Sequence, residues 1–299
     1  MNGRFLAVSA LLAALAVGAV WLSVRAPSGT GQPGYPVQRT VRYSFTVENT
    51  ESRPLEAVRF RTYAPVERTP TQKLVGLEAS HPYEAETDAL GNRVLRFTIR
   101  HLPPNGRAIV RITAHLRLAD KANRVTRLER AEKLLSPSAL APIGNARIQE
   151  LAGSLAGEDP EGTVRAVQKW TVDNIAYQGY LPEDHGALYA LEEGTGDCTE
   201  AMSLVLALLR ANKIPALGVA GFPTTRSQVL HPEGFHNWAM AWAGGTFWES
   251  DPVNERLAKG LPGYIAFRLL ATKNGADPIL GTQSFFHTGR SSVAIRMNG

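Results

Sequence analysis

Between residues 38 and 118, apolar and polar side chains alternate with a period of two. This period is typical of β-strands that bury one face and expose the other. The clearest run places Val41, Tyr43, Phe45 and Val47 on one side of a strand, with polar residues between them. Further runs of similar length are separated by turn residues: 57–63, 74–77, 94–99 and 110–118. This part of the chain is therefore constrained to fold as short strands.

About five short strands with turns between them predict a β-sandwich of immunoglobulin or fibronectin type over residues 38–118. The region contains no group of polar residues that suggests chemistry. We interpret it as a spacer or packing domain.

The hydrophobic period becomes helical between residues 119 and 157, and a further helix is expected at 163–175. A loop through His185 and Gly186 then leads to an apolar helix that starts at Cys198 and ends before Pro215. The rest is predicted to be rich in strands: 216–222, 235–243, 247–251 and 264–270. The chain is thus predicted to be α+β, with a second domain over 119–299.

An apolar run from Phe5 to Val24 lies between Arg4 and Arg25. About twenty apolar residues suffice to cross a bilayer as a helix, whereas the apolar part of a cleaved signal peptide usually has about 7–15 residues. We predict that residues 1–25 are a signal anchor in the inner membrane, with a cleaved signal peptide as the alternative. Residues 26–37, rich in proline and glycine, are predicted to be a flexible linker. Either way the protein is expected to be exported to the periplasm or cell envelope.

Composition narrows the possible partners. The net charge of +5 is spread thinly, without a run of Lys and Arg, so no nucleic-acid partner is predicted. A single cysteine excludes an internal disulfide and a cysteine-based zinc site. We expect no metal and no organic cofactor, and the sequence makes no prediction of the oligomeric state.

That single cysteine, Cys198, stands at a helix start, after Gly194-Thr195-Gly196-Asp197. The first N–H groups of a helix are unpaired, and the positive end of the helix dipole favours a thiolate, which is the nucleophilic form of cysteine. A buried, inert cysteine is the alternative. A nucleophilic role for Cys198 therefore requires a nearby base.

A predicted hairpin supplies such a base. His236 begins one strand, Gly244-Gly245 forms the turn, and Asp251 ends the returning strand. Counting outward from the turn makes His236 and Asp251 near neighbours across the strands, within reach of a hydrogen bond. His231 is the rival base. A metal site of His231, His236 and Asp251 lacks any standard ligand spacing.

Several of these stretches together resemble the bacterial transglutaminase-like superfamily of papain-like cysteine enzymes. They are Gly196-Asp197-Cys198-Thr199-Glu200 with its apolar helix, Ile214-Pro215-Ala216, His236-Asn237-Trp238, and Trp248 to Asp251-Pro252. The resemblance covers roughly residues 120–260. It implies that Cys198 is the nucleophile, His236 the general base and acid, and Asp251 the carboxylate that orients His236.

Two features differ from the family pattern or leave a choice open. His-Ala-Trp is commoner in the family than the His-Asn-Trp found here, and Glu249 could replace Asp251 because residues two apart share a strand face. The backbone N–H of Cys198 is one candidate donor to the oxyanion. Candidates for a second donor are Tyr177, Gln178 and Tyr180.

The sequence and the resemblance together predict an exported enzyme that attacks peptide or glutamine amide bonds through a thioester. Hydrolysis by water is favoured over cross-linking, because no amine-binding site is evident. A non-catalytic scaffold that binds peptides or proteins within an envelope assembly is the alternative. A third possibility is an enzyme with one dedicated partner in such an assembly.

Overall fold

The computed structural model describes residues 34–299 except 89, 126–127, 129–130, 261–262 and 271–284. The predicted signal anchor at 1–25 and most of the predicted linker at 26–37 lie outside the described residues. Within the described ranges, none of the helices has the length and apolar character needed to cross a membrane.

The first six strands all precede the helices: β1 Val37–Asn49, β2 Leu55–Ala64, β3 Gln72–Ala79, β4 Tyr83–Thr87, β5 Arg93–Leu102 and β6 Arg107–Leu118. Helices and two short strands follow: α1 Ala131–Leu134, α2 Ala146–Ser154, α3 Pro160–Asn174, β7 Ala176–Tyr177, α4 Gly186–Glu193, β8 Thr195–Gly196 and α5 Cys198–Ala211. The last part is rich in strands: β9 Ala216–Pro223, β10 Gln228–Val229, the 3-10 helix Pro232–Gly234, β11 His236–Ala243, β12 Thr246–Asp251, β13 Arg256–Lys259, β14 Tyr264–Leu270, β15 Phe286–His287 and β16 Val293–Asn298.

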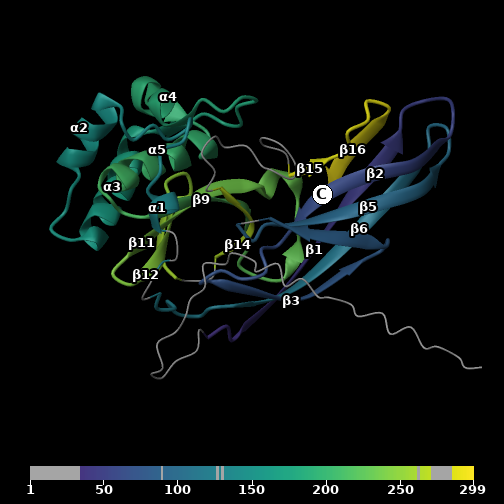
Figure 1. Ribbon diagram of the computed structural model, residues 1–299, viewed down its shortest axis with the longest axis horizontal. Coiled ribbons are helices and arrows are strands. Elements are labelled where there is room, and N and C mark those ends of the chain that lie inside the picture. Colours follow the sequence, from purple (N-terminus) through teal and green to yellow (C-terminus); the bar gives the residue numbers. More distant parts are fainter. Residues whose placement is uncertain (1–33, 89, 126–127, 129–130, 261–262, 271–284) are drawn as a thin grey trace, which may run out of the picture.

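The six N-terminal strands form two sheets that pack against each other (Figure 1). One sheet has the order β10-β1-β6-β3, with β16 also paired to β1, and the other has the order β15-β2-β5-β4. Apolar side chains from both sheets share one core, in which the Phe60 ring contacts Phe45 and stacks on Phe97. The sheets thus also include strands from residues 286–298. The division into 38–118 and 119–299, and the immunoglobulin-like assignment, stay predictions.

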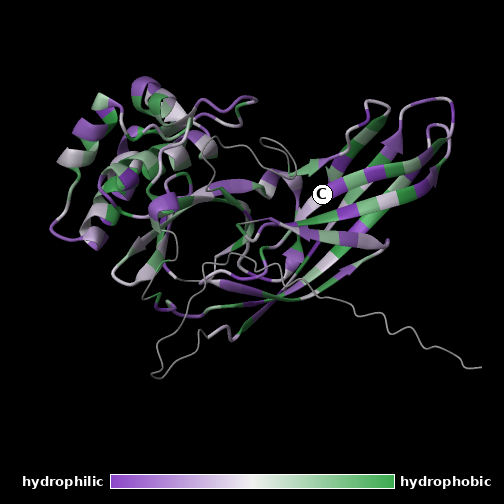
Figure 2. Cartoon of the chain, viewed as in Figure 1, coloured by the Kyte–Doolittle hydropathy of each residue, from purple (hydrophilic) through white to green (hydrophobic). Residues whose placement is uncertain are grey.

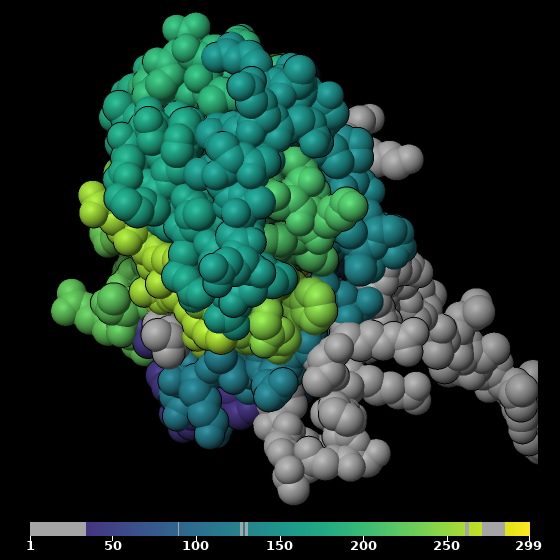
Figure 3. Space-filling view, turned by 90° about the vertical axis from the view of Figure 1, so that its left-hand side faces the viewer, coloured from purple at the N-terminus to yellow at the C-terminus, as the bar shows by residue number. Residues whose placement is uncertain are grey.

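A second five-stranded sheet, β13-β12-β11-β9-β14, lies between the helices and the sandwich (Figure 1). One face packs on helices α2 to α5 through alanines of β9 and β11. The other face buries Trp238, Met240 and Phe247 with Val66 and Val125. The helices lie on the side of the sheet away from the sandwich (Figure 1), and Figure 3 views the molecule from that side, where their teal and green atoms face the viewer. Because both faces are covered, polar residues on this sheet can be buried.

The described residues correct two expectations about the helical region. Between 119 and 157, the described residues form only two helices, α1 with four residues and α2 with nine. The expected loop after His185 is instead helix α4, which packs on α5 through the buried Ala187 and Ala190. Gly194 ends α4 in the left-handed conformation that favours glycine, at φ 66°.

Candidate active site

The start of α5 holds Cys198 in a capped helix turn. Asp197 is the N-cap, and its carboxylate accepts a hydrogen bond of 2.6 Å from the Thr199 N–H. The Glu200 carboxylate reaches back to the Asp197 N–H at 3.1 Å, which completes a capping box. Cys198 itself is partly exposed, whereas Glu200 is fully buried. The thiol therefore stands at an ordered, positive helix end that solvent or a ligand can reach.

Gly196 permits this close packing before the cysteine. A Cβ atom at residue 196 would lie 2.5 Å from the Cβ of Glu200, so any other residue would displace the capping carboxylate. Strand β8, which contains Gly196, pairs in parallel with β7. This pairing brings residues 176–178, including Tyr177, next to the start of α5.

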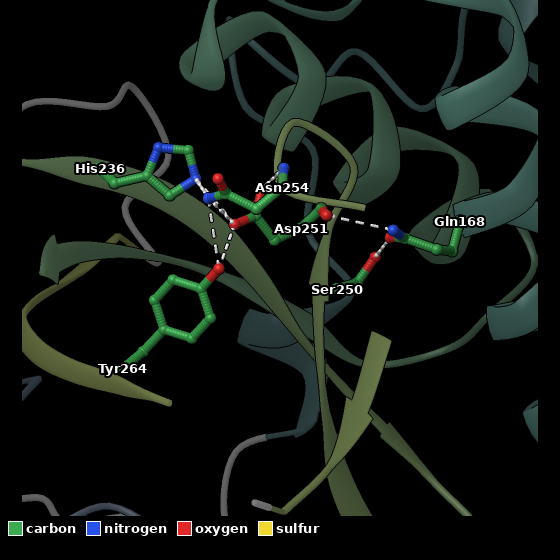
Figure 4. Close-up of polar contacts among 6 residues, drawn as sticks. All are labelled: Gln168, His236, Ser250, Asp251, Asn254 and Tyr264. Atoms are coloured by element: carbon green, nitrogen blue, oxygen red, sulfur yellow. Dashed lines mark hydrogen bonds and ion pairs between the residues drawn. The ribbon is translucent and has the colours of Figure 1, made fainter. Parts of the chain in front are cut away.

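His236 and Asp251 come from the two strands of a tight hairpin. Ala243 pairs with Thr246, and both turn glycines have positive φ, 60° for Gly244 and 75° for Gly245, as a two-residue turn of this kind requires. The His236 Nε2 lies 2.8 Å from the Asp251 Oδ2 (Figure 4). The structure thus brings together the two residues that the sequence placed at opposite ends of the hairpin.

Besides His236, two other residues donate hydrogen bonds to the Asp251 carboxylate (Figure 4). The Tyr264 hydroxyl donates to Oδ2 at 2.5 Å and the Asn254 side-chain amide at 2.7 Å, while the Asn254 backbone N–H donates to Oδ1 at 3.3 Å. Gln168 of α3 donates to the Asp251 carbonyl at 3.1 Å and accepts from the Ser250 hydroxyl at 2.6 Å. The carboxylate is fully buried but well supplied with donors.

Charges and hydrogen bonds shift both groups from their ordinary protonation behaviour. Burial acts to lower the pKa of His236, but hydrogen bonds and charges from Asp251 and Cys198 outweigh it and raise that pKa to about 9. Burial acts to raise the pKa of Asp251, yet the bonds from His236, Tyr264 and Asn254, with the His236 charge, hold it below its usual range. The pair therefore favours an imidazolium beside a carboxylate.

Cys198 lies close enough to His236 to contribute to the raised pKa of the imidazole. A direct bond also joins their two elements, because the Asn237 side chain of β11 donates to the Thr199 hydroxyl of α5 at 3.0 Å. Asn237 follows His236 and Thr199 follows Cys198. This bond fixes the strand that carries the imidazole relative to the helix that carries the thiol. The asparagine that departs from the commoner His-Ala-Trp order therefore has a structural role.

The alternatives raised by the sequence lie differently. His231 precedes the 3-10 helix, and no hydrogen bond within the described part of the chain joins it to Cys198 or Asp251. Glu249 is buried and lies 3.3 Å from the Arg256 guanidinium, and burial raises its pKa to about 8. The carboxylate that contacts His236 is therefore that of Asp251.

The possible oxyanion donors differ in their surroundings. Tyr180 is 82% exposed, and the Gln178 side chain donates to the Tyr189 hydroxyl. The pKa of Tyr177 is raised by burial and then by the charges of Cys198 and Asp197, which indicates that Tyr177 lies near the thiol. Among the three candidates, Tyr177 therefore has the clearest electrostatic link to Cys198.

Other features bear on what can bind here. A cavity of about 50 Å³ is lined by Thr199 and Asn237, by Arg210 and Arg268, and by apolar side chains such as Phe235; Cys198, His236 and Asp251 do not line it. In the ranges that the structure describes, no cluster of three His, Cys, Asp or Glu side chains could hold a metal ion. The site is thus a thiol, an imidazole and a carboxylate.

Sequence reasoning missed Tyr264 and Asn254. Asn254 lies three residues after Asp251, in a turn begun by Asp251-Pro252, and a side chain that folds back to the aspartate is a recognisable turn feature. Tyr264 comes from β14 at the far edge of the sheet, so its contact depends on strand order and has no local signal.

Comparisons with known proteins place part of the chain in a family. Residues 149–252, which include Cys198, His236 and Asp251, match the family model of the transglutaminase-like superfamily. No curated protein matches the chain.

Solved structures resemble the chain at low identity. One is "a Putative Cysteine Protease from Cytophaga hutchinsonii", with 19% identity and a TM-score of 0.58 over 87% of this chain and 92% of that one. This likeness shows a common fold. Another is the periplasmic domain of TgpA from Pseudomonas aeruginosa, with 17% identity and a TM-score of 0.38 over 71% of this chain and 88% of that one. A superposition this loose does not establish a shared fold.

Proposed function

We propose that this chain, whose residues 149–252 match the transglutaminase-like superfamily, is a cysteine enzyme that cleaves amide bonds of a peptide or protein substrate. The observation that carries the proposal is the arrangement around His236. Its imidazole bonds to the buried Asp251 carboxylate and interacts with Cys198 at the start of α5. A nucleophile, a base and a group that orients the base are the parts that thiol catalysis requires.

In the proposed reaction, Cys198 and His236 start as a thiolate and an imidazolium, and the thiolate attacks the carbonyl carbon of a peptide or glutamine amide. The C–N bond breaks as the His236 imidazolium gives its proton to the leaving amine, which leaves a thioester on Cys198. Water activated by His236 then hydrolyses the thioester and restores the thiol. Asp251 holds the imidazole in orientation and stabilises its charged form.

The Cys198 N–H at the helix start is the proposed first donor to the oxyanion, with a second donor from 177–180. Hydrolysis is proposed over cross-linking because the sequence shows no site for an attacking amine. We propose no cofactor in this mechanism.

Location and domain assignment remain parts of the proposal. The apolar run Phe5–Val24 supports export and a tether in the inner membrane, so that the enzyme acts in the periplasm or cell envelope. We also propose an immunoglobulin- or fibronectin-like character for the sandwich, based on its short alternating strands. Fractionation of cells that express the full chain, with and without residues 1–25, tests the tether.

The central experiment compares wild type, Cys198→Ala and His231→Ala. Each is incubated with a mixture of peptides, and cleavage, ammonia release and the mass of cross-linked products are read together. We expect Cys198→Ala to lose at least about 10³-fold in activity, as removal of a catalytic nucleophile does, and His231→Ala to stay near wild type. Activity that persists in Cys198→Ala would contradict the mechanism. Cys198 labelling by iodoacetamide at the rate of an ordinary thiol would favour the scaffold alternative.

A further inference from the structure

The sandwich carries a second hollow, unrelated to the cysteine site. A groove of about 810 Å³ lies on the outer face of the β15-β2-β5-β4 sheet. The inner face of the same sheet is the apolar core of the sandwich. Arginine is the commonest lining residue of this groove: Ala57, Arg59, Arg61, Glu84, Arg96, Thr98, His287, Thr288, Gly289 and Arg290. We call it the arginine groove.

Strand register concentrates positive charge in the arginine groove. Arg61 of β2 stands directly opposite Arg96 of β5, and His287 of β15 stands opposite Arg61 on the other side. Like charges directly across a sheet destabilise the folded state. Glu84 and Glu86 offset part of this repulsion, at 3.6 and 2.6 Å from Arg96.

Two arginines of the groove keep N–H donors available for a ligand. Arg59 is exposed, and its side chain forms no ion pair or hydrogen bond with any residue in the described ranges. Arg290 donates one hydrogen bond to the Glu56 carbonyl at 3.2 Å, which holds its charged group at the groove. A guanidinium has five N–H donors, so Arg290 keeps most of them available.

The spacing of the lining arginines suits carboxylates on an extended chain. Arg59 and Arg61 are successive residues on one strand face and therefore stand roughly 6.6–6.8 Å apart, the spacing of alternate side chains in an extended peptide. Guanidinium groups bind carboxylates with paired hydrogen bonds. The described lining offers no large apolar side chain to enter a bilayer and no Phe, Tyr or Trp to stack on a base.

We propose that the arginine groove binds an extended acidic segment of a protein, with alternate carboxylates held by Arg59, Arg61 and Arg290. The shape supports this occupant, because a single extended chain can enter a groove and a flat membrane surface cannot. The proposal does not depend on the chemistry of Cys198.

The test measures binding of a fluorescent eight-residue peptide of alternating glutamate and serine to the full chain by anisotropy, in wild type and Cys198→Ala. The matched ligand has glutamine in place of glutamate. The variants are Arg59→Gln with Arg290→Gln, and as a control Arg117→Gln, an exposed arginine on the other sheet. Circular dichroism verifies the fold of each.

We expect saturable binding of the glutamate peptide that weakens about tenfold in the double variant and weakens with added salt, with the Arg117→Gln control within about twofold of wild type. Equal binding of the glutamine peptide, equal loss in the control, or no binding at millimolar peptide would overturn the proposal. So would tighter binding at these arginines of a single-stranded oligonucleotide or of phosphatidylserine vesicles.

Discussion

The sandwich exposes its polar side chains, whereas the second sheet, β13-β12-β11-β9-β14, buries many of its polar side chains. Along β5, Arg96, Thr98 and Arg100 point outward while Leu95, Phe97 and Ile99 enter the core, so colour alternates along these strands in Figure 2. Along β12, every residue is buried, including Glu249, Ser250 and Asp251. The difference arises because helices cover one face of the second sheet, and residues such as Val66, Val125 and Leu134 pack on the other.

Burial of a polar group costs free energy unless the group finds partners. The sandwich avoids this cost by exposing its charges, whereas the second sheet meets it with the bonds around Asp251. The contrast teaches that the buried carboxylates of the second sheet have partners: donors around Asp251, and Arg256 beside Glu249. The variants below test where that rule holds.

The largest effect on kcat/KM is expected in β12, where Asp251 and Glu249 are two buried carboxylates on one strand face. Asp251→Asn removes the charge that supports the His236 imidazolium, and we expect kcat/KM to fall by about 10³-fold or more. Glu249→Gln, the matched change two residues earlier, is expected to stay within about threefold of wild type, because Glu249 contacts Arg256 and not His236. Steady-state kinetics on the peptide identified above measures both. Equal losses would place Glu249 in the reaction.

Glu249 is also expected to make the free energy of unfolding depend on pH. Burial raises the pKa of Glu249 to about 8 in the folded chain, above its ordinary value, so the folded state holds a proton that the unfolded state has lost. Stability should therefore fall as pH rises from about 4.5 to about 8, and Glu249→Gln should remove that slope. Urea unfolding at several pH values measures it.

A large effect on stability without one on chemistry is expected in the sandwich. Phe97 is fully buried and stacks on Phe60, with 5.7 Å between the two ring centroids. Phe97→Ala should lower the free energy of unfolding by about 3–5 kcal/mol through lost burial and a cavity. Activity per folded molecule should stay within about twofold, with the folded fraction measured by circular dichroism. A large loss of kcat/KM in the folded fraction would show that the sandwich core shapes the active site.

The same difference explains what the sequence could predict. The sandwich strands were predicted because one covered face makes polarity alternate, and β4 was missed because its residues are mostly exposed and lack that pattern. The His236–Asp251 contact was predictable because a two-glycine turn sets the register over a few residues. Helix α4 was missed because glycines at both ends made residues 186–193 resemble a loop.

Contacts between distant segments could not be predicted. Tyr264 reaches Asp251 only because β14 lies beside β9, which lies beside β11. The C-terminal strands β15 and β16 join the sandwich across more than 220 residues of sequence, and no local pattern specifies that pairing.

The smallest of these effects concerns Tyr264. It tests whether the hydrogen bond of a buried hydroxyl group matters for activity. The Tyr264 hydroxyl donates to Asp251, whereas the buried Tyr63 hydroxyl of the sandwich has no hydrogen-bond partner among the described residues. The pKa of Asp251 is below its usual range, so its stabilising charge is present above about pH 4 and lost as pH falls through the lowered pKa. Tyr264→Phe removes one of the bonds that lower this pKa.

We therefore expect the acid limb of the pH–activity profile of Tyr264→Phe to move up by about half a unit to one unit, with kcat/KM at the optimum changed about threefold or less. Acid unfolding should begin at a correspondingly higher pH. Tyr63→Phe, which removes a hydroxyl that bonds to nothing described, should leave both curves where they are. If the two variants shift equally, the Tyr264 hydroxyl only fills space. If only Tyr264→Phe shifts, the bond from β14 tunes Asp251 and, through Asp251, the imidazole of His236.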